Sequence, residues 1–179
     1  MKIAKEILLV PFLLTVLCVA DARATEVKSD YDRSYPLHRF QAFTFVAQHN
    51  TSPADALAGD ELVARRIQSA ITRNLITIGC VEEKVADFAV TFRAVVRNQA
   101  QLSTSGFPRL GTGRLWVDNY TVGTIIVEFR DAKSGDLVWR GSVSGTVDPN
   151  KNEEKINAGI KKLIARFAKD REKQQAGKK

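Results

Sequence analysis

The chain has 179 residues, 44% of them hydrophobic and 26% charged, and its formal net charge at pH 7 is +7. This length suits one domain that buries a core of its own. A mildly basic balance is compatible with solubility and with weak attraction to an anionic surface, but it does not indicate nucleic-acid binding. With two cysteines and two histidines in all, a disulfide framework is excluded as the source of stability, and little remains for a metal site.

Residues 1–24 have the pattern of a secretory signal peptide. Two lysines precede an apolar run over residues 7–20, and the small residues Ala22 and Ala24 stand just before Thr25, where signal peptidase requires small side chains. We therefore expect cleavage between Ala24 and Thr25, and an exported protein of the periplasm or cell envelope.

Two alternatives to cleavage concern the membrane. The apolar run is shorter than the roughly 20 residues of a membrane-spanning helix, which argues against a permanent anchor. Cys18 lies where a bacterial lipoprotein carries its lipid, yet Leu17 stands directly before it, where the lipoprotein peptidase requires a small side chain. Membrane association, with anchoring at the outer membrane as the alternative location, is expected only if Cys18 is lipidated.

Cys80 is the one cysteine that remains after such cleavage, so no intramolecular disulfide is expected. A reactive thiol and an intermolecular bridge are the alternatives to burial. Because Cys80 follows Ile78 and Gly79 at the expected exit of a helix into the core, we favour a buried and inert side chain.

The first expected elements are a strand and a helix. Phe40, Phe43 and Phe45 indicate a strand near the start of the exported chain. Apolar residues then recur at helical spacing, which predicts a helix from Asp60 to Ile78 that ends at Gly79. The members of this apolar stripe are Val63, Ile67, Ala70, Ile71, Leu75 and Ile78.

Alternating residues predict strands in the second half of the chain. Phe88, Val90, Phe92, Ala94 and Val96 alternate with mainly polar residues, as in a half-buried strand. A hairpin is expected next, with its turn over residues 131–136. Its strands carry the apolar residues Ile125, Val127, Phe129, Leu137, Trp139 and Val143, and Gly141 and Gly145 mark a bulge or a close approach of another element.

A second helix is expected after residues 148–150. Its apolar stripe is Ile156, Ile160, Leu163, Ile164 and Phe167. The charged residues 170–179 predict a basic, disordered tail. The expected organisation is thus a signal peptide over 1–24, one domain over 25–169 and a tail over 170–179.

This order of elements predicts an α+β fold. We expect a mainly antiparallel sheet of about four to five strands, with the two amphipathic helices packed on one face. The first strand, the first helix and the second strand are compatible with a crossover unit, in which case those two strands are parallel.

The segment 98–122 has no assigned structural role, and it is long for a loop in a compact domain. Its aromatic and arginine side chains on a glycine-rich backbone are typical of a binding surface. The candidate binding residues are Phe107, Arg109, Arg114, Trp116 and Tyr120. The alternative is an extended hairpin that packs Trp116 and Tyr120 on the sheet.

No catalytic chemistry can be assembled from the sequence. His38 and His49 belong to no metal-ligating motif, and no nucleophile elbow, phosphate-binding loop or paired cysteine motif is present. We assign no catalytic, cofactor-binding or metal-ligating residue, expect no cofactor, and do not expect an enzyme.

Several stretches resemble a known family. Residues 30–32, the aromatic residues near 40–45, the stretch 123–129, the turn 131–135, the stretch 137–141 and residues 145–151 are similar to domain-of-unknown-function family 4136. The resemblance implies an exported or lipid-anchored domain of the bacterial envelope, and it carries over no activity and no site residue. Leu17 departs from the lipoprotein pattern.

Three classes of function follow from these observations. The first is a non-catalytic envelope module that binds an unknown envelope protein, a glycan or a lipid surface, and not nucleic acid. The second is a periplasmic carrier of a small ligand or lipid, which requires an apolar pocket between sheet and helices. An enzyme ranks last.

Overall fold

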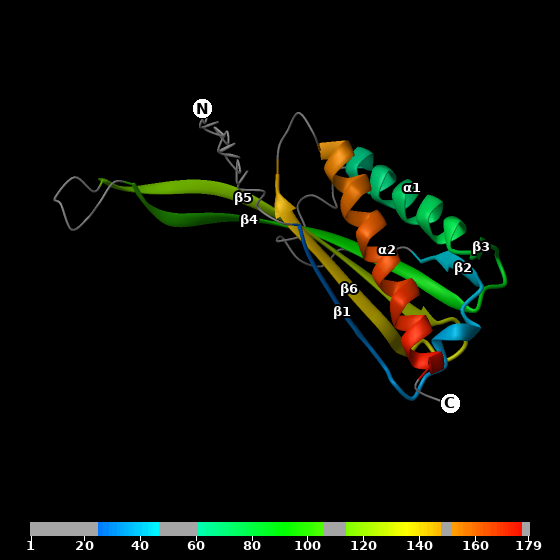
Figure 1. Cartoon of the computed structure of the whole chain (residues 1–179). Coiled ribbons are helices and arrows are strands. Elements are labelled where there is room, and N and C mark those ends of the chain that lie inside the picture. The colour runs from blue at the N-terminus through cyan, green and yellow to red at the C-terminus, as the bar shows by residue number, and fades with distance from the viewer. Residues whose placement is uncertain (1–24, 47–60, 106–113, 148–151, 177–179) are drawn as a thin grey trace, which may run out of the picture.

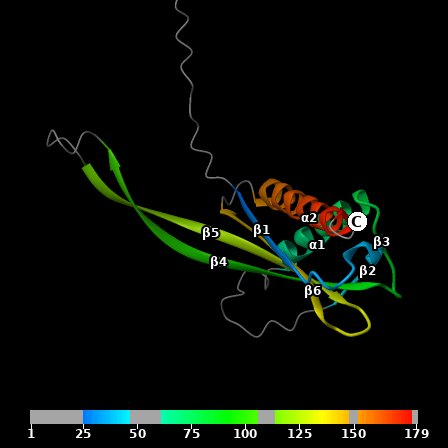
Figure 2. The same ribbon diagram turned by 60° about the horizontal axis from the view of Figure 1, so that its bottom comes forward.

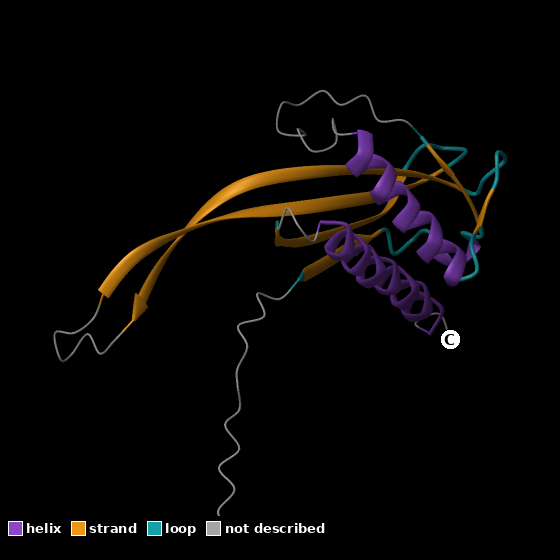
Figure 3. Cartoon of the chain, turned by 90° about the horizontal axis from the view of Figure 1, so that it is seen from above, coloured by secondary structure: helices purple, strands orange, loops and turns teal. Residues whose placement is uncertain are grey.

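The computed structural model of the chain describes residues 25–46, 61–105, 114–147 and 152–176. Among these residues, two helices lie on the same side of one twisted sheet, and no described helix covers its other face (Figure 1 and Figure 3). The expected α+β class is confirmed. We call the face without helices the open face.

The sheet is mixed and has six strands, more than the four to five expected. Its strand order is β1-β6-β5-β4-β2-β3. The pairs β1–β6, β5–β6 and β4–β5 are antiparallel, whereas β2 pairs in parallel with β3 and β4. The bounds are β1 Glu26–Tyr31, β2 Ala42–Phe45, β3 Val81–Glu82, β4 Phe88–Ser105, β5 Arg114–Asp131 and β6 Leu137–Thr146.

The additional strands are the two outermost ones. β1 turns only Val27, Ser29 and Tyr31 toward the helices, so its sequence lacks a continuous apolar face. β3 has two residues, both exposed. Such edge strands form through backbone hydrogen bonds to a neighbouring strand. Their own sequences carry no pattern that predicts this pairing.

The first helix, α1, runs over Glu61–Thr77, and Gly79 follows it with a φ of +88°. Prediction and structure agree here, since all but one of the expected stripe residues are buried. The helix connects β2 to β4, and the parallel pairing of these strands confirms the crossover unit. Within the described residues, neither helix combines the length and the apolar character needed to cross a membrane.

The second helix, α2, runs over Asn152–Ala176, so the expected disordered tail is wrong for residues 170–176. Asp170 is 1% exposed and accepts hydrogen bonds from Ser29 Oγ (2.7 Å) and Trp139 Nε1 (3.2 Å). Gln174 accepts one from the backbone N–H of Leu37 (2.8 Å). These partners lie far away in the sequence, and they hold the last two turns of α2 against the sheet.

Aromatic rings fill the space between sheet and helices at one end of the domain. Phe129 stacks on Trp139 with ring centroids 4.7 Å apart and meets Phe167 edge-on at 4.8 Å. Phe40 stacks on Phe88 at 4.4 Å. All five side chains are fully buried. We call this region, defined by Phe40, Phe88, Phe129, Trp139 and Phe167, the filled end.

Cys80 is buried beside the filled end, as expected. Burial raises the pKa of its thiol, although the guanidinium of Arg171 opposes this shift. A thiol that is buried and protonated is a poor nucleophile, which agrees with a packing role.

Candidate functional site

The long strands β4 and β5 continue beyond the rest of the sheet. β6 ends its pairing with β5 at Val122, whereas the β4–β5 pairing goes on from Asn98 opposite Thr121 to Ser105 opposite Arg114. This outer part, residues 98–105 and 114–121, projects away from the helices and the other strands (Figure 1 and Figure 2). We call it the ribbon. The segment expected as a possible loop is therefore largely strand, as in the hairpin alternative.

The ribbon separates the candidate binding residues. Phe107 and Arg109 lie outside the described residues, while Arg114 and Trp116 belong to the outer part of β5, where only the backbone is described. Tyr120 is half-buried, and its hydroxyl donates a hydrogen bond to Gln99 Oε1 on β4 (2.9 Å). Of the five residues, Tyr120 is thus the one with a described contact, and this contact ties the two strands of the ribbon together.

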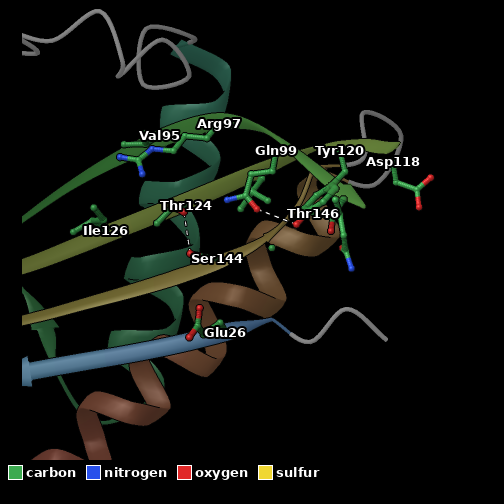
Figure 4. Close-up of a pocket in the computed structure, with 13 residues that line it drawn as sticks. Glu26, Val95, Arg97, Gln99, Asp118, Tyr120, Thr124, Ile126, Ser144 and Thr146 are labelled. Carbon is green, nitrogen blue, oxygen red and sulfur yellow. Dashed lines mark hydrogen bonds between the residues drawn. The ribbon is translucent and has the colours of Figure 1, made fainter. Parts of the chain in front are cut away.

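A polar groove of about 830 Å³ lies on the open face where the ribbon leaves the sheet. Figure 4 shows its lining side chains on β1, β4, β5 and β6, with the helices behind the sheet. Thr124 Oγ1 and Ser144 Oγ form a hydrogen bond across its floor (2.9 Å). The groove carries both signs of charge; its polar residues include Glu26, Arg97, Gln99, Gln101, Asp118 and Tyr120.

The open face behind the filled end carries a cluster of paired charges. Glu128 is 6% exposed, and its carboxylate lies 2.6 Å from Arg140 and 3.2 Å from Arg130. Burial opposes ionisation of this carboxyl, but the hydrogen bonds and charges of the two arginines outweigh it and hold the pKa of Glu128 below its ordinary value. The cluster fixes β5 against β6.

A second hollow, about 450 Å³ in volume, lies between the sheet and the first turns of both helices. We call it the end cavity. Its walls are mainly apolar and come from α1, α2 and three central strands. They include Val63, Ile67, Ala94, Ile125, Val143 and Ile156.

The end cavity exists because small residues meet there. Ala94, Gly123, Gly145 and Gly159, from four different elements, all line it. A Cβ atom added to Gly145 has no heavy atom of the described residues within 4 Å, whereas one added to Gly141, four residues earlier on the same strand, lies 2.3 Å from the Trp139 ring and 2.7 Å from Leu163 of α2. The sequence signal for Gly141, a close approach of another element, is confirmed. The role of Gly145 in a cavity was missed, because its partners converge only in the folded chain.

Tyr35 and Asp131 form a further pair of ionisable groups, which supports the fold. Tyr35 donates a hydrogen bond to Asp131, and burial together with this carboxylate raises the pKa of Tyr35 to about 12. In the part of the chain that the structure describes, no three potential metal ligands converge. His38 is exposed on the short 3-10 helix Leu37–Arg39, and His49 lies outside the described residues. These two hollows are the candidate binding sites, because the polar side chains of the groove and the apolar walls of the end cavity are of kinds that contact partners or ligands.

Comparison with known proteins gives a fold and a family. No curated protein matches the chain. A PDZ domain protein from Parabacteroides distasonis has 9% sequence identity and a TM-score of 0.55 over 79% of this chain and 35% of that chain. The present chain thus spans about a third of the length of that protein, and at this identity the likeness concerns the fold alone. PelC from Paraburkholderia phytofirmans has 15% identity and a TM-score of 0.46 over 81% of this chain and 98% of that chain.

The family model covers nearly all the elements described above. The model of a domain of unknown function (DUF4136) matches residues 27–167, from β1 into the second half of α2. It includes α1, the ribbon, the first part of α2 and all or nearly all of every strand of the sheet, and it confirms the resemblance seen in the sequence. The chain belongs to the DUF4136 family.

Proposed function

We propose that this chain is an exported, non-catalytic binding module of the bacterial cell envelope, which contacts a protein, glycan or lipid surface through the ribbon and the open-face groove. The observation that carries the proposal is the ribbon itself. Its eight residue pairs, from Asn98–Thr121 to Ser105–Arg114, extend beyond β6 on one side and β2 on the other.

The ribbon supports binding because it contributes little to the core. Asn98, Gln99 and Gln101 are exposed, and the Val117 side chain is 58% exposed. A two-stranded ribbon is at best marginally stable by itself, and its free edges are prone to unwanted pairing. A segment that brings this liability without filling the core is better explained by a contact that it makes.

The chemistry of the groove favours a polar, macromolecular partner. Arg97 and Asp118 give it both signs of charge, and Tyr120 supplies an aromatic ring with a polar end. Such mixed polar and aromatic surfaces are typical of the parts of interfaces that set orientation and specificity.

A photo-reactive amino acid tests this surface in intact cells. The crosslinker is placed at Val117 on the ribbon, and at the exposed Lys161 of α2 as the matched control. We expect one recurrent adduct from position 117 and none of that mass from position 161. The same purified material should begin at Thr25. Equal adducts from both positions, or none from position 117, would contradict binding through the ribbon, and a lipid on Cys18 would contradict cleavage at Thr25.

The end cavity favours a second candidate function, carriage of a small apolar ligand. Its volume of about 450 Å³ lies within the roughly 300–1,000 Å³ of small-molecule sites. The test of this candidate is whether a neutral apolar probe, dodecanol, binds the purified protein and is displaced when the cavity is filled by a side chain.

A further inference from the structure

We propose that the end cavity binds one unbranched hydrocarbon chain, with an anionic head group held at Lys155. Carriage of a small apolar ligand was the second candidate function. The proposal rests on that function and names the class of ligand. It concerns a place distinct from the ribbon, since no residue of the ribbon is among the described residues that line the end cavity, although Thr124, Ser144, Gly145 and Thr146 at this end of the sheet line both the end cavity and the open-face groove.

The walls of the end cavity suit a hydrocarbon chain. Ile67 is fully buried and Val63 and Val143 are at most 8% exposed, so these side chains form a closed inner wall. Ile125 and Ile156 are only partly buried, and they leave apolar surface facing the hollow. Covering such surface removes it from water, which is the main source of affinity for an apolar ligand.

The hollow is built into the backbone rather than left by loose packing. Close to it, Gly159 of α2 approaches β6 so tightly that an added Cβ atom lies 3.2 Å from Val143. The helix and the sheet are therefore in contact beside the end cavity. The space at Gly145 persists because no side chain is present to fill it, and further approach of α2 is blocked at Gly159.

The rim of the end cavity supplies one positive charge. Lys155 carries the only ionisable side chain among the described lining residues. Its ammonium group donates one hydrogen bond to the carbonyl oxygen of Thr146 (3.0 Å), and an ammonium has three N–H donors. The nearby Glu153 is engaged by Arg66 (3.5 Å). A carboxylate or phosphate at the rim therefore meets Lys155 and the positive end of the helix dipole of α2.

The size of the cavity limits the ligand to a single chain. About 450 Å³ lies toward the lower end of the range for small-molecule sites, roughly 300–1,000 Å³. The ligand class is thus a fatty acid or the single acyl chain of a lysophospholipid, and these two share a chain with an anionic head. Affinity should increase about fourfold for each added methylene until the cavity is full, as expected for burial of one methylene group.

Calorimetry with dodecanoate tests the proposal on the purified protein. Gly145→Leu places a side chain into the hollow, and we expect it to weaken dodecanoate binding by about tenfold or more, since ligand and leucine compete for one space. Ser142→Leu introduces the same side chain on the opposite face of β6 and should leave the affinity unchanged. Melting temperatures of both variants verify that each is folded.

The head group is tested by removing the charge at the rim. Lys155→Met keeps an unbranched, apolar stem, and we expect it to weaken the binding of dodecanoate but not of dodecanol. Lauroyl lysophosphatidic acid identifies the source of the anion. Tighter binding than dodecanoate would assign a lipid phosphate, and the reverse order would assign a free carboxylate.

The outcomes separate the proposal from the function on which it rests. If dodecanol binds and is displaced by Gly145→Leu, but Lys155→Met affects neither ligand, carriage stands and the anionic ligand is wrong. If neither ligand binds, or Gly145→Leu binds dodecanoate as tightly as the unchanged protein, both are wrong. If Gly145→Leu proves unfolded, the unchanged protein is studied by NMR with dodecanoate that carries a paramagnetic label on its chain. The label should broaden the methyl signals of Ile125 and Ile156. If these signals stay sharp, the proposal is overturned.

Discussion

At the filled end, five aromatic rings occupy the space between the sheet and the helices, whereas at the end cavity the same two layers carry branched aliphatic side chains together with alanine and glycine, and no aromatic ring is among the described lining residues. Both ends use β4, β5, β6 and α2. The difference therefore arises from side-chain size and not from the arrangement of the elements. It indicates that one end supplies the stability of the domain, while the other end is available for binding.

The largest effect is expected where the rings are removed. Phe129→Ala takes away a fully buried ring that contacts Trp139, Phe88 and Phe167, and it should lower the free energy of unfolding by about 3–5 kcal/mol. Urea unfolding followed by circular dichroism measures this. A loss below about 1 kcal/mol would mean that the filled end does not dominate stability.

The two glycines of β6 compare the two ends with one substitution. Gly141→Ala forces a methyl group against Trp139 and Leu163, and it should lower the free energy of unfolding by about 1–3 kcal/mol. Gly145→Ala adds the same group in open space, and its effect should lie within about 0.5 kcal/mol of zero or be slightly stabilising. If urea unfolding gives equal losses of unfolding free energy for the two variants, the loss depends on the position in a strand and not on the side chains around the glycine.

The paired charges behind the filled end predict a dependence on pH. The pKa of Glu128 lies below its ordinary value of 4.5 in the folded protein, so its stabilisation is complete above pH 4.5 and is lost as the pH falls through the lower, folded-state value. Glu128→Gln should cost about 1 kcal/mol at pH 7. The difference between the two proteins should shrink toward pH 3, and a difference that grows on acidification would contradict the sign.

The smallest effect on stability is expected on the ribbon. The double variant Trp116→Ala with Tyr120→Ala should change the free energy of unfolding by no more than about 0.5 kcal/mol, because the ribbon extends beyond the core and the hydrogen bond from Tyr120 to Gln99 is exposed, and yet weaken crosslinking from position 117. Differential scanning calorimetry measures the first effect. A large loss of stability would assign these side chains to packing on the sheet.

The sequence predicted those elements whose apolar residues are periodic. The stripe of α1 and the β5–β6 hairpin contain enough apolar residues at one spacing to define their buried faces, and both were found where expected. The last turns of α2 were missed because they are buried through polar residues. Asp170 and Gln174 resemble part of a charged tail until Trp139 and Leu37 are brought beside them.

The end cavity was not predictable for a related reason. A hollow is defined by side chains that are absent, and Ala94, Gly123 and Gly159 lie on three elements that are distant in the sequence. Periodicity describes one element at a time. The residues of the ribbon, in contrast, were predicted from the sequence as a candidate binding segment. Their structure was left open between a loop and an extended hairpin.

Nuclear Overhauser contacts between dodecanoate and the methyl groups of the protein test most directly whether the end cavity is a binding site. We expect contacts from the chain protons to Ile67, Ile125 and Ile156, and none to the rings of Phe88 and Phe129. Contacts to the filled end or to the ribbon in place of these isoleucines would contradict this expectation, as would the absence of any contact at saturating dodecanoate.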